Sequence, residues 1–236
     1  MSSTTWTPTA VASEARAWEG LAWRMVEAQH IASTMKLVDG ADEQDLLERL
    51  LETSKPPRAP GTTELHYRLA TPFRYSPMRG GSRFRDTHDP GVFYGAETVR
   101  TACMELGYWR WRFLMDAPAL PSLAPLPFTA FSSRIATTCI DLREPPFDVD
   151  AGTWRHSDDY TRTQAMARIA READLGALVY ASVRDPSPAW CVAVLAPSGF
   201  ASPRPEPGEQ TWWLQVSRDN ALWKRDDVRF TWTPPT

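Results

Sequence analysis

The residues best suited to chemistry lie between Arg68 and Glu105. Arg68 and Arg74 precede a loop of residues 80–85, Gly-Gly-Ser-Arg-Phe-Arg, and Tyr94 and Glu105 follow it. Planar guanidinium groups form paired hydrogen bonds to phosphate, and glycines let backbone N–H groups approach an anion. A tyrosine ring can stack on a base, while a carboxylate can hold ribose hydroxyls and stabilise positive charge on a sugar. These residue types together predict a site that cleaves the N-glycosidic bond of an anionic, nucleotide-like substrate.

Each of these residues also has an ordinary structural explanation. Loop arginines are usually solvated, a tyrosine in a strand usually packs in the core, and a glutamate on a helix is usually a surface charge. Only the combination favours a functional site.

Motifs of other enzyme classes are missing from the sequence. It contains no GxGxxG, Walker, HExxH or GxSxG pattern, and we therefore set aside redox, metal-dependent and classical hydrolase chemistry. The four histidines lack metal-ligand spacing, so we expect no metal site. They are His30, His66, His88 and His156.

Composition narrows the class of protein further. The 236 residues are 42% hydrophobic and 23% charged, as in a folded globular chain, and the net charge of −3 leaves no global basic field for nucleic acid. The three cysteines, Cys103, Cys139 and Cys191, are widely spaced, and we expect buried reduced thiols. Without a signal-peptide pattern or a stretch of about 18 apolar residues, we expect a cytoplasmic protein with no membrane segment.

The first part of the chain is predicted to be helical. Apolar residues recur at steps of three and four over residues 10–38, and residues 42–51 begin a second helix with acidic side chains in its first turn. We therefore expect residues 1–58 to form a helical hairpin that packs on a catalytic domain of residues 59–236.

The second part alternates short strands with helices, which predicts an α+β fold. A helix over residues 97–114 carries Glu105 at the flank of its apolar face, because successive helical residues are rotated by about 100°. A second helix is expected at residues 160–173, and residues 117–132, rich in proline, should be irregular. The expected strands are residues 65–70, 92–96, 135–141, 177–182, 190–195, 212–216 and 228–232.

The pattern of these residues resembles the RES-domain proteins, NAD-consuming toxins of bacterial toxin–antitoxin pairs named for Arg, Glu and Ser. The family pattern has an arginine near the first strand, then Gly-Gly-Arg beside an aromatic residue, a strand ending in Tyr, and Glu eleven residues later. Here Arg68, Arg83, Tyr94 and Glu105 match it, and Ser182 matches the family serine. The resemblance covers most of the chain after Leu65.

The chain departs from the family pattern in the arginines. Ser82 interrupts Gly-Gly-Arg and Phe84 replaces the more common Trp, so Arg83 or Arg85 can be the family arginine, with Arg83 favoured by adjacency. Arg68 or Arg74 can be the first one. Trp190 stands where the family pattern has Asn.

The resemblance implies an ADP-ribosyltransferase-like split β core that binds NAD as its substrate, with no further cofactor. It implies that Arg83 and Arg68 grip the diphosphate and ribose, with Arg74 and Arg85 as further candidates. Tyr94 would stack near the nicotinamide, Glu105 would stabilise the oxocarbenium-like sugar, and Ser182 would orient the ribose or Glu105.

Three outcomes share this first step. Water or phosphate as acceptor makes the protein an NAD-degrading enzyme, which we favour, and a protein side chain as acceptor makes it an ADP-ribosyltransferase with a protein target. An antitoxin is the implied partner. A different class, a non-catalytic nucleotide- or RNA-binding module, is disfavoured by the overall acidity and by Glu105, which would lie poorly beside phosphates.

Overall fold

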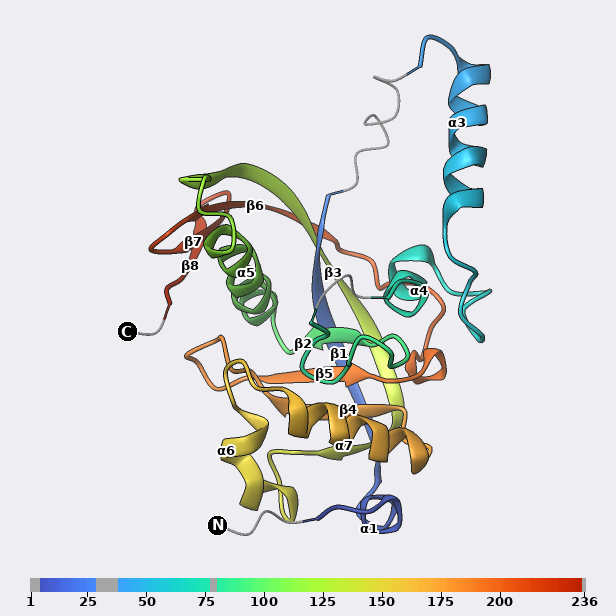
Figure 1. Cartoon of the computed structure of the whole chain (residues 1–236), viewed down its shortest axis with the longest axis vertical. Coiled ribbons are helices and arrows are strands. Elements are labelled where there is room, and N and C mark those ends of the chain that lie inside the picture. Colours follow the sequence, from blue (N-terminus) through green and yellow to red (C-terminus); the bar gives the residue numbers. More distant parts are fainter. Residues whose placement is uncertain (1–4, 29–37, 77–79, 235–236) are drawn as a thin grey trace.

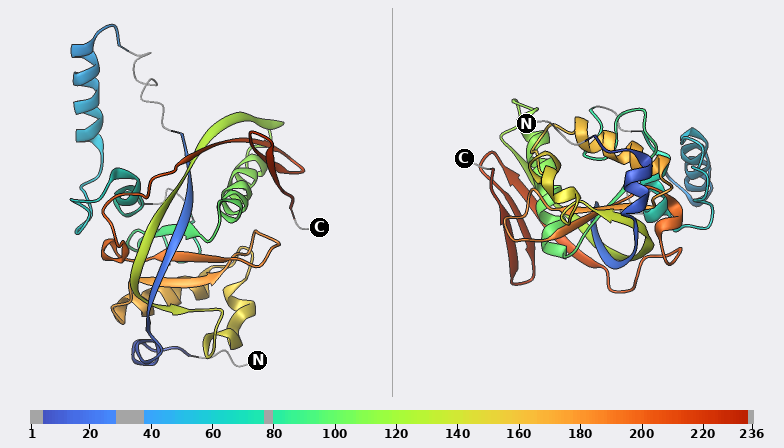
Figure 2. Two further views of the ribbon diagram at one scale, coloured as in Figure 1. Left: turned by 180° about the vertical axis from the view of Figure 1, so that it is seen from behind. Right: turned by 90° about the horizontal axis from the view of Figure 1, so that it is seen from below.

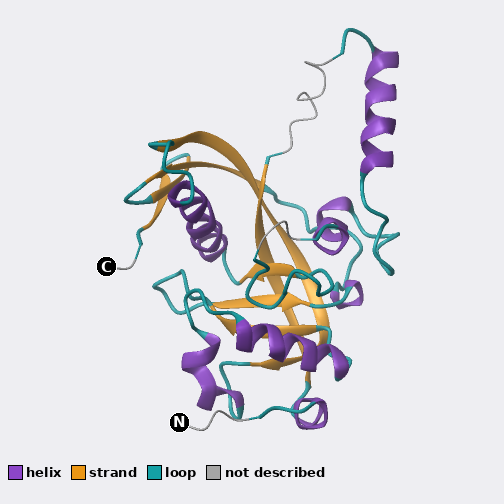
Figure 3. Cartoon of the chain, in the orientation of Figure 1, coloured by secondary structure: helices purple, strands orange, loops and turns teal. Residues whose placement is uncertain are grey.

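The structure is a computed structural model that describes residues 5–28, 38–76 and 80–234. These residues form an α+β fold, as the sequence predicts, in which several helices pack on one eight-stranded sheet and one helix stands apart from it (Figures 1 and 3). The helices are α1 (Pro8–Ser13), α3 (Ala41–Ser54), α4 (Tyr67–Arg74), α5 (Val99–Met115), η1 (Phe147–Asp150), α6 (Ala151–Trp154), α7 (Thr161–Glu172) and η2 (Pro197–Gly199). The strands are β1 (Arg16–Glu27), β2 (Phe93–Ala96), β3 (Ser122–Asp141), β4 (Ala177–Ala181), β5 (Trp190–Val194), β6 (Gln210–Ser217), β7 (Ala221–Arg225) and β8 (Val228–Trp232).

A long ribbon of two strands organises the sheet. β1 pairs antiparallel with β3 along its whole length. The N-terminal half of β3 also pairs with β6, which continues to β7 and β8, while its C-terminal end pairs in parallel with β4, which continues to β5 and β2. The sheet is therefore split into two halves that share the ribbon. β2 meets β1 at one register position, Trp23 opposite Ala96.

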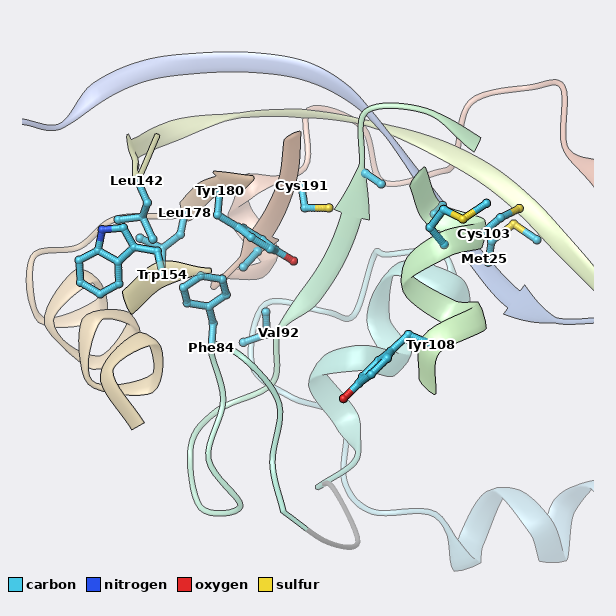
Figure 4. Close-up of a cluster of buried hydrophobic side chains, with 14 of the residues drawn as sticks. Met25, Phe84, Val92, Cys103, Tyr108, Leu142, Trp154, Leu178, Tyr180 and Cys191 are labelled. Carbon is cyan, nitrogen blue, oxygen red and sulfur yellow. The ribbon is translucent and has the colours of Figure 1, made fainter. Parts of the chain in front are cut away.

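Helices cover both halves of the split sheet. α5 packs against β6, β7 and β8 and also contacts β1, while α7 packs near β4 (Figures 1 and 2). Successive residues of the central strands enter two different hydrophobic clusters, because neighbouring side chains of a strand point to opposite faces. Leu178 lies in the larger cluster, which Figure 4 shows with Phe84 and Tyr180, and Val179 lies in the smaller one.

The predicted helix over residues 10–38 is wrong for most of its described length. Residues 8–13 are helical, but residues 16–27 form β1, and residues 29–37 lie outside the described part of the chain. Short apolar patterns fit either a helix or a strand, and here the long-range pairing with β3 decides. Residues 16–27 therefore belong to the main sheet and not to a helical hairpin. The domain boundary expected at residue 58 stays a prediction.

Two other predictions are also corrected. Residues 67–74 form α4 and not a strand, because His66 accepts a hydrogen bond from the Arg68 N–H (3.3 Å) and Leu69 and Phe73 are buried on one face. The proline-rich segment after residue 121 forms the first part of β3. Its pairing with β6 shifts register between Leu123 and Leu126, where Pro125 can be accommodated without breaking the ladder.

Most other elements agree with their predictions. The helices near residues 42–51, 97–114 and 160–173 and the strands from residue 177 onward form as expected, and β7 was not predicted. All three cysteines are buried free thiols, as predicted. Within the described ranges, no helix combines the length and the apolar character that crossing a bilayer would require.

Candidate active site

A cavity of about 200 Å³ lies where β1, β2 and α5 meet. β1, β2 and α5 form three sides of the cavity, and the loop at residues 82–83 completes it together with Tyr160, Tyr180, Arg184 and Cys191. The lining residues are Trp23, Arg24, Met25, Ser82, Arg83, Tyr94, Gly95, Ala96, Ala102, Glu105, Leu106, Trp109, Tyr160, Tyr180, Arg184 and Cys191.

Glu105 provides the carboxylate of this cavity. It lies in the middle of α5, whose first turn is capped by the Thr98 hydroxyl, which accepts from the Thr101 N–H (3.1 Å). One carboxylate oxygen of Glu105 accepts hydrogen bonds from the Ser182 hydroxyl (2.6 Å) and the Val183 N–H (3.3 Å). Among the lining residues that the structure describes, no other side chain carries a carboxylate.

Ser182 is held in turn by the backbone that follows it. Its hydroxyl accepts hydrogen bonds from the Arg184 N–H (3.3 Å) and the Asp185 N–H (3.1 Å), and it donates to Glu105. A hydroxyl that donates one hydrogen bond and accepts others has a defined orientation, so it holds the Glu105 carboxylate in one position. The family resemblance implies that Ser182 orients either the ribose or Glu105, and in the structure its hydroxyl contacts Glu105.

Tyr94 lines the cavity and also anchors the loop that carries Arg83. The hydroxyls of Tyr94 and Ser82 are hydrogen-bonded (2.7 Å), and the Tyr94 hydroxyl oxygen accepts from the Phe84 N–H (3.0 Å). Burial raises the pKa of the Tyr94 phenol, so it stays protonated at neutral pH. In the same loop Gly81 has φ +66°, and a Cβ there would lie 2.4 Å from the Arg85 carbonyl oxygen. The turn therefore requires glycine at this position.

Arg83 and Arg184 are buried cations at the cavity wall. Arg83 donates to the Trp154 and His156 carbonyls (2.9 Å each), and its guanidinium carbon lies 4.8 Å from the centre of the Tyr160 ring. Arg184 lies 3.4 Å from the centre of the Tyr108 ring and donates to the Tyr160 hydroxyl (3.2 Å). Both guanidinium groups are thus held by neutral partners.

Arg24 is a third cation, and the sequence prediction missed it. Its guanidinium donates to the Tyr94 carbonyl oxygen (2.9 Å) and lies 4.9 Å from the centre of the Phe93 ring, while its Nε is buried without a hydrogen-bond partner in the described part of the chain. Burial lowers its pKa to about 10, so it is still charged at neutral pH. The sequence signal for Arg24 is its place in the run Ala22-Trp23-Arg24-Met25-Val26, which suits a strand, although the apolar spacing over residues 10–38 predicts a helix.

These three arginines give the cavity its electrostatic character. No ion pair joins Arg24, Arg83 or Arg184 to a carboxylate among residues 5–28, 38–76 and 80–234. Buried cations without a carboxylate partner are costly unless an anion binds them. The arrangement therefore suits an anionic ligand with aromatic or sugar groups, placed against a fixed carboxylate.

The other predicted arginines do not line this cavity. Arg68 is ion-paired with Glu209. Arg74 binds Glu52 (2.9 Å) and the Pro56 carbonyl. Arg85 donates to the carbonyls of Asp89 (3.2 Å) and Tyr75 (2.8 Å). Of the alternatives left open by the sequence, the structure brings Arg83 and not Arg85 to the cavity.

Comparison with known proteins places this geometry in context. The family model described as "RES domain" matches residues 55–217, a span that holds Arg83, Tyr94, Glu105 and Ser182 but not β1. A chain in the crystal structure of the M. tuberculosis MbcT–MbcA toxin–antitoxin complex is similar, with a TM-score of 0.50 and 10% identity over 84% of this chain and 86% of that one. At this identity the likeness shows the fold alone, and it agrees with the expected split β core. No curated protein matches the sequence.

Proposed function

Because this chain belongs to the RES-domain family, we propose that it is the toxin of a toxin–antitoxin pair and that it cleaves the nicotinamide–ribose bond of NAD. The observation that carries this proposal is the single carboxylate, Glu105, held by Ser182 in a cavity walled by the buried Arg83 and Arg184 and the partly buried Arg24, none of which has a carboxylate partner in the described part of the chain. NAD matches these features, because it combines a diphosphate, two riboses and two aromatic bases.

The chemistry needs one carboxylate. When the bond between ribose C1′ and the nicotinamide nitrogen breaks, its electron pair goes to the nitrogen, and the positively charged ring leaves as neutral nicotinamide. The leaving group therefore needs no proton from a general acid, unlike the paired-carboxylate glycosidases. The positive charge moves to the sugar, where the Glu105 carboxylate stabilises it.

The arginines and aromatic rings position the substrate. Arg24, Arg83 and Arg184 are charged groups at the cavity wall that can hold the diphosphate. Their guanidinium groups, which donate to carbonyl and hydroxyl oxygens in this structure, can also donate to phosphate oxygens. Tyr94, Tyr160 and Trp109 provide rings against which a base can pack. The acceptor is water or phosphate in an NAD-degrading enzyme, and a protein side chain in an ADP-ribosyltransferase.

The partner that follows from this proposal is a cognate antitoxin. Support comes from the family and from the similar solved structure, which is a toxin–antitoxin complex. An antitoxin that covers the cavity would block NAD entry.

The proposal is tested by incubating the purified protein with NAD and measuring released nicotinamide, with and without phosphate. We expect Glu105→Gln to lower turnover roughly 100-fold or more, because the replacement cannot stabilise the charge on the sugar. Glu172→Gln, at an exposed position at the end of α7, is the matched control and should keep wild-type turnover. Absence of nicotinamide release by the wild type, or full activity of Glu105→Gln, refutes the proposal.

Nicotinamide release with and without phosphate distinguishes the two small-molecule acceptors. Turnover that requires phosphate identifies phosphorolysis, and turnover without phosphate identifies hydrolysis. Label transferred from NAD to protein in a cell extract identifies ADP-ribosyl transfer.

A further inference from the structure

A second cavity, of about 60 Å³, adjoins the candidate active site at Arg24. Arg24 lines both cavities, so a phosphate bound to its guanidinium would stand between them. The remaining residues of the second cavity come from the end of β1, from α4 and from β3. They are Val26, Glu27, Tyr67, Arg68, Thr71, Pro72 and Thr129.

Tyr67 gives this second cavity an exposed aromatic surface. It is the first residue of α4 and is 49% exposed, and its ring centre lies 4.5 Å from that of His66. α4 itself is anchored because Leu69 and Phe73 are buried in the smaller hydrophobic cluster. An exposed ring on an anchored helix is a platform on which a base can stack.

Arg68 adds a cation that a ligand can recruit. Its Nε donates to the Tyr67 hydroxyl (3.1 Å), its guanidinium carbon lies 5.6 Å from the centre of the Phe131 ring, and it is ion-paired with Glu209. The Glu209 side chain is 59% exposed, and ion pairs with an exposed partner contribute little to stability. A phosphate or a ribose hydroxyl can therefore take the place of this carboxylate at small cost.

The acidic residue of the second cavity is already neutralised. Glu27 lines it, and its carboxylate is ion-paired with Arg110. The lining consequently combines two arginines, one compensated glutamate, two threonine side chains and one exposed aromatic ring. This set is suited to a phosphate, a sugar and a base.

We infer that the second cavity and the surface of Tyr67 bind the adenylate half of a dinucleotide, with the nicotinamide half in the first cavity and the diphosphate at Arg24. This inference rests on the proposed cleavage of NAD. A cavity of about 60 Å³ encloses only part of a nucleotide, so the adenine lies on the exposed part of the Tyr67 ring. The adenylate half thus contributes affinity without contacting the bond that breaks.

Kinetics with two substrates test the inference. Nicotinamide mononucleotide contains the bond to be cleaved but lacks the adenylate half. In Tyr67→Ala and Arg68→Gln we expect kcat/KM for NAD to fall about tenfold more than kcat/KM for nicotinamide mononucleotide, because base stacking and one phosphate contact are lost only with NAD. Equal losses on the two substrates, or no loss on either, would overturn the inference.

Matched controls lie on exposed strands. Trp213→Ala removes an aromatic side chain that is 50% exposed on β6, and Arg229→Gln removes an exposed arginine of β8. Neither lines either cavity, so both should keep the wild-type ratio of the two kcat/KM values. A change of the ratio in these controls equal to that in the test variants would contradict the assignment of the surface.

A binding measurement separates this inference from the proposed function. We expect calorimetry to detect adenosine monophosphate bound to the wild type and binding about tenfold weaker in Tyr67→Ala. Binding of this probe without nicotinamide release from NAD supports the second cavity and refutes the proposed cleavage. Nicotinamide release without binding of the probe, or binding that Tyr67→Ala leaves unchanged, refutes the second cavity alone.

Discussion

Replacing Ser182 by alanine removes the hydroxyl that orients Glu105. The hydrogen bond between them is 2.6 Å long and has a carboxylate as its acceptor, and hydrogen bonds to charged groups contribute about 1.5–3 kcal/mol. The remaining backbone donor to that oxygen is the Val183 N–H, at 3.3 Å, which is too long to hold the carboxylate alone. If the lost interaction acts in the transition state, kcat falls about 10- to 150-fold.

The assay is nicotinamide release under steady-state conditions. A residue that positions Glu105 should change kcat more than KM, because the substrate still meets the arginines and the aromatic wall. The variant also leaves the N–H groups of Arg184 and Asp185 without their acceptor, so we expect its free energy of unfolding to fall by about 1–2 kcal/mol. Thermal unfolding measures this second effect separately.

Ser182→Thr is the control, because it retains a hydroxyl at the same position. It should restore most of the lost kcat. The reasoning is refuted if Ser182→Ala keeps wild-type kcat, or if Ser182→Thr is impaired as severely as Ser182→Ala. A lower melting temperature with unchanged kcat would show that the hydroxyl serves only the turn after β4.

Three further predictions concern other parts of the chain. Arg24→Gln should lower kcat/KM for NAD roughly 100-fold in the same assay, since it removes a partly buried cation from the cavity wall, and wild-type kinetics would contradict this. Gly81→Ala should lower the free energy of unfolding by roughly 2 kcal/mol in denaturant titrations, because φ is +66° and the added Cβ would collide with the Arg85 carbonyl oxygen. Unchanged stability would contradict this prediction. Hydrogen bonds from Lys55 and Arg74 lower the pKa of Glu52 to about 2, so the ion pair between Glu52 of α3 and Arg74 of α4 should be complete above pH 4.5 and be lost as the pH falls through 2; an NMR titration of the Glu52 carboxyl with its midpoint near 4.5 would refute this.

Local sequence patterns were sufficient for the part of the site around Glu105. The run at residues 92–96 has strand-forming residues, and the apolar spacing over residues 97–114 is helical, so the positions of Tyr94 and Glu105 on a strand and the following helix could be predicted. Short-range spacing decides such elements because their side chains interact mainly with near neighbours in the chain. Ser182 was assigned through the family resemblance, and its contact with Glu105 spans 77 residues.

Local sequence patterns gave wrong predictions where pairing between strands far apart in the sequence determines the structure. Residues 16–27 carry apolar spacings that suit a helix, but they form β1 because β3, more than 100 residues later, offers a complete antiparallel partner. Because a helix was expected there, Arg24 was not among the predicted site residues; it reaches the cavity only when β1 lies beside β2. The prolines near the start of β3 likewise predicted an irregular segment, although Pro127 pairs with Trp213 in the ladder and the register shifts only beside Pro125.

The sequence by itself therefore determined the α+β class, the family pattern and the residue types of the site. Only the tertiary structure decided which arginines belong to it. Guanidinium groups near one another in the sequence, such as Arg83 and Arg85, point to different surroundings, while Arg24, Arg83 and Arg184 meet at one cavity from three distant segments. The physical reason is that a side chain's direction depends on the element that carries it, and here a long β ribbon and a split sheet set those directions.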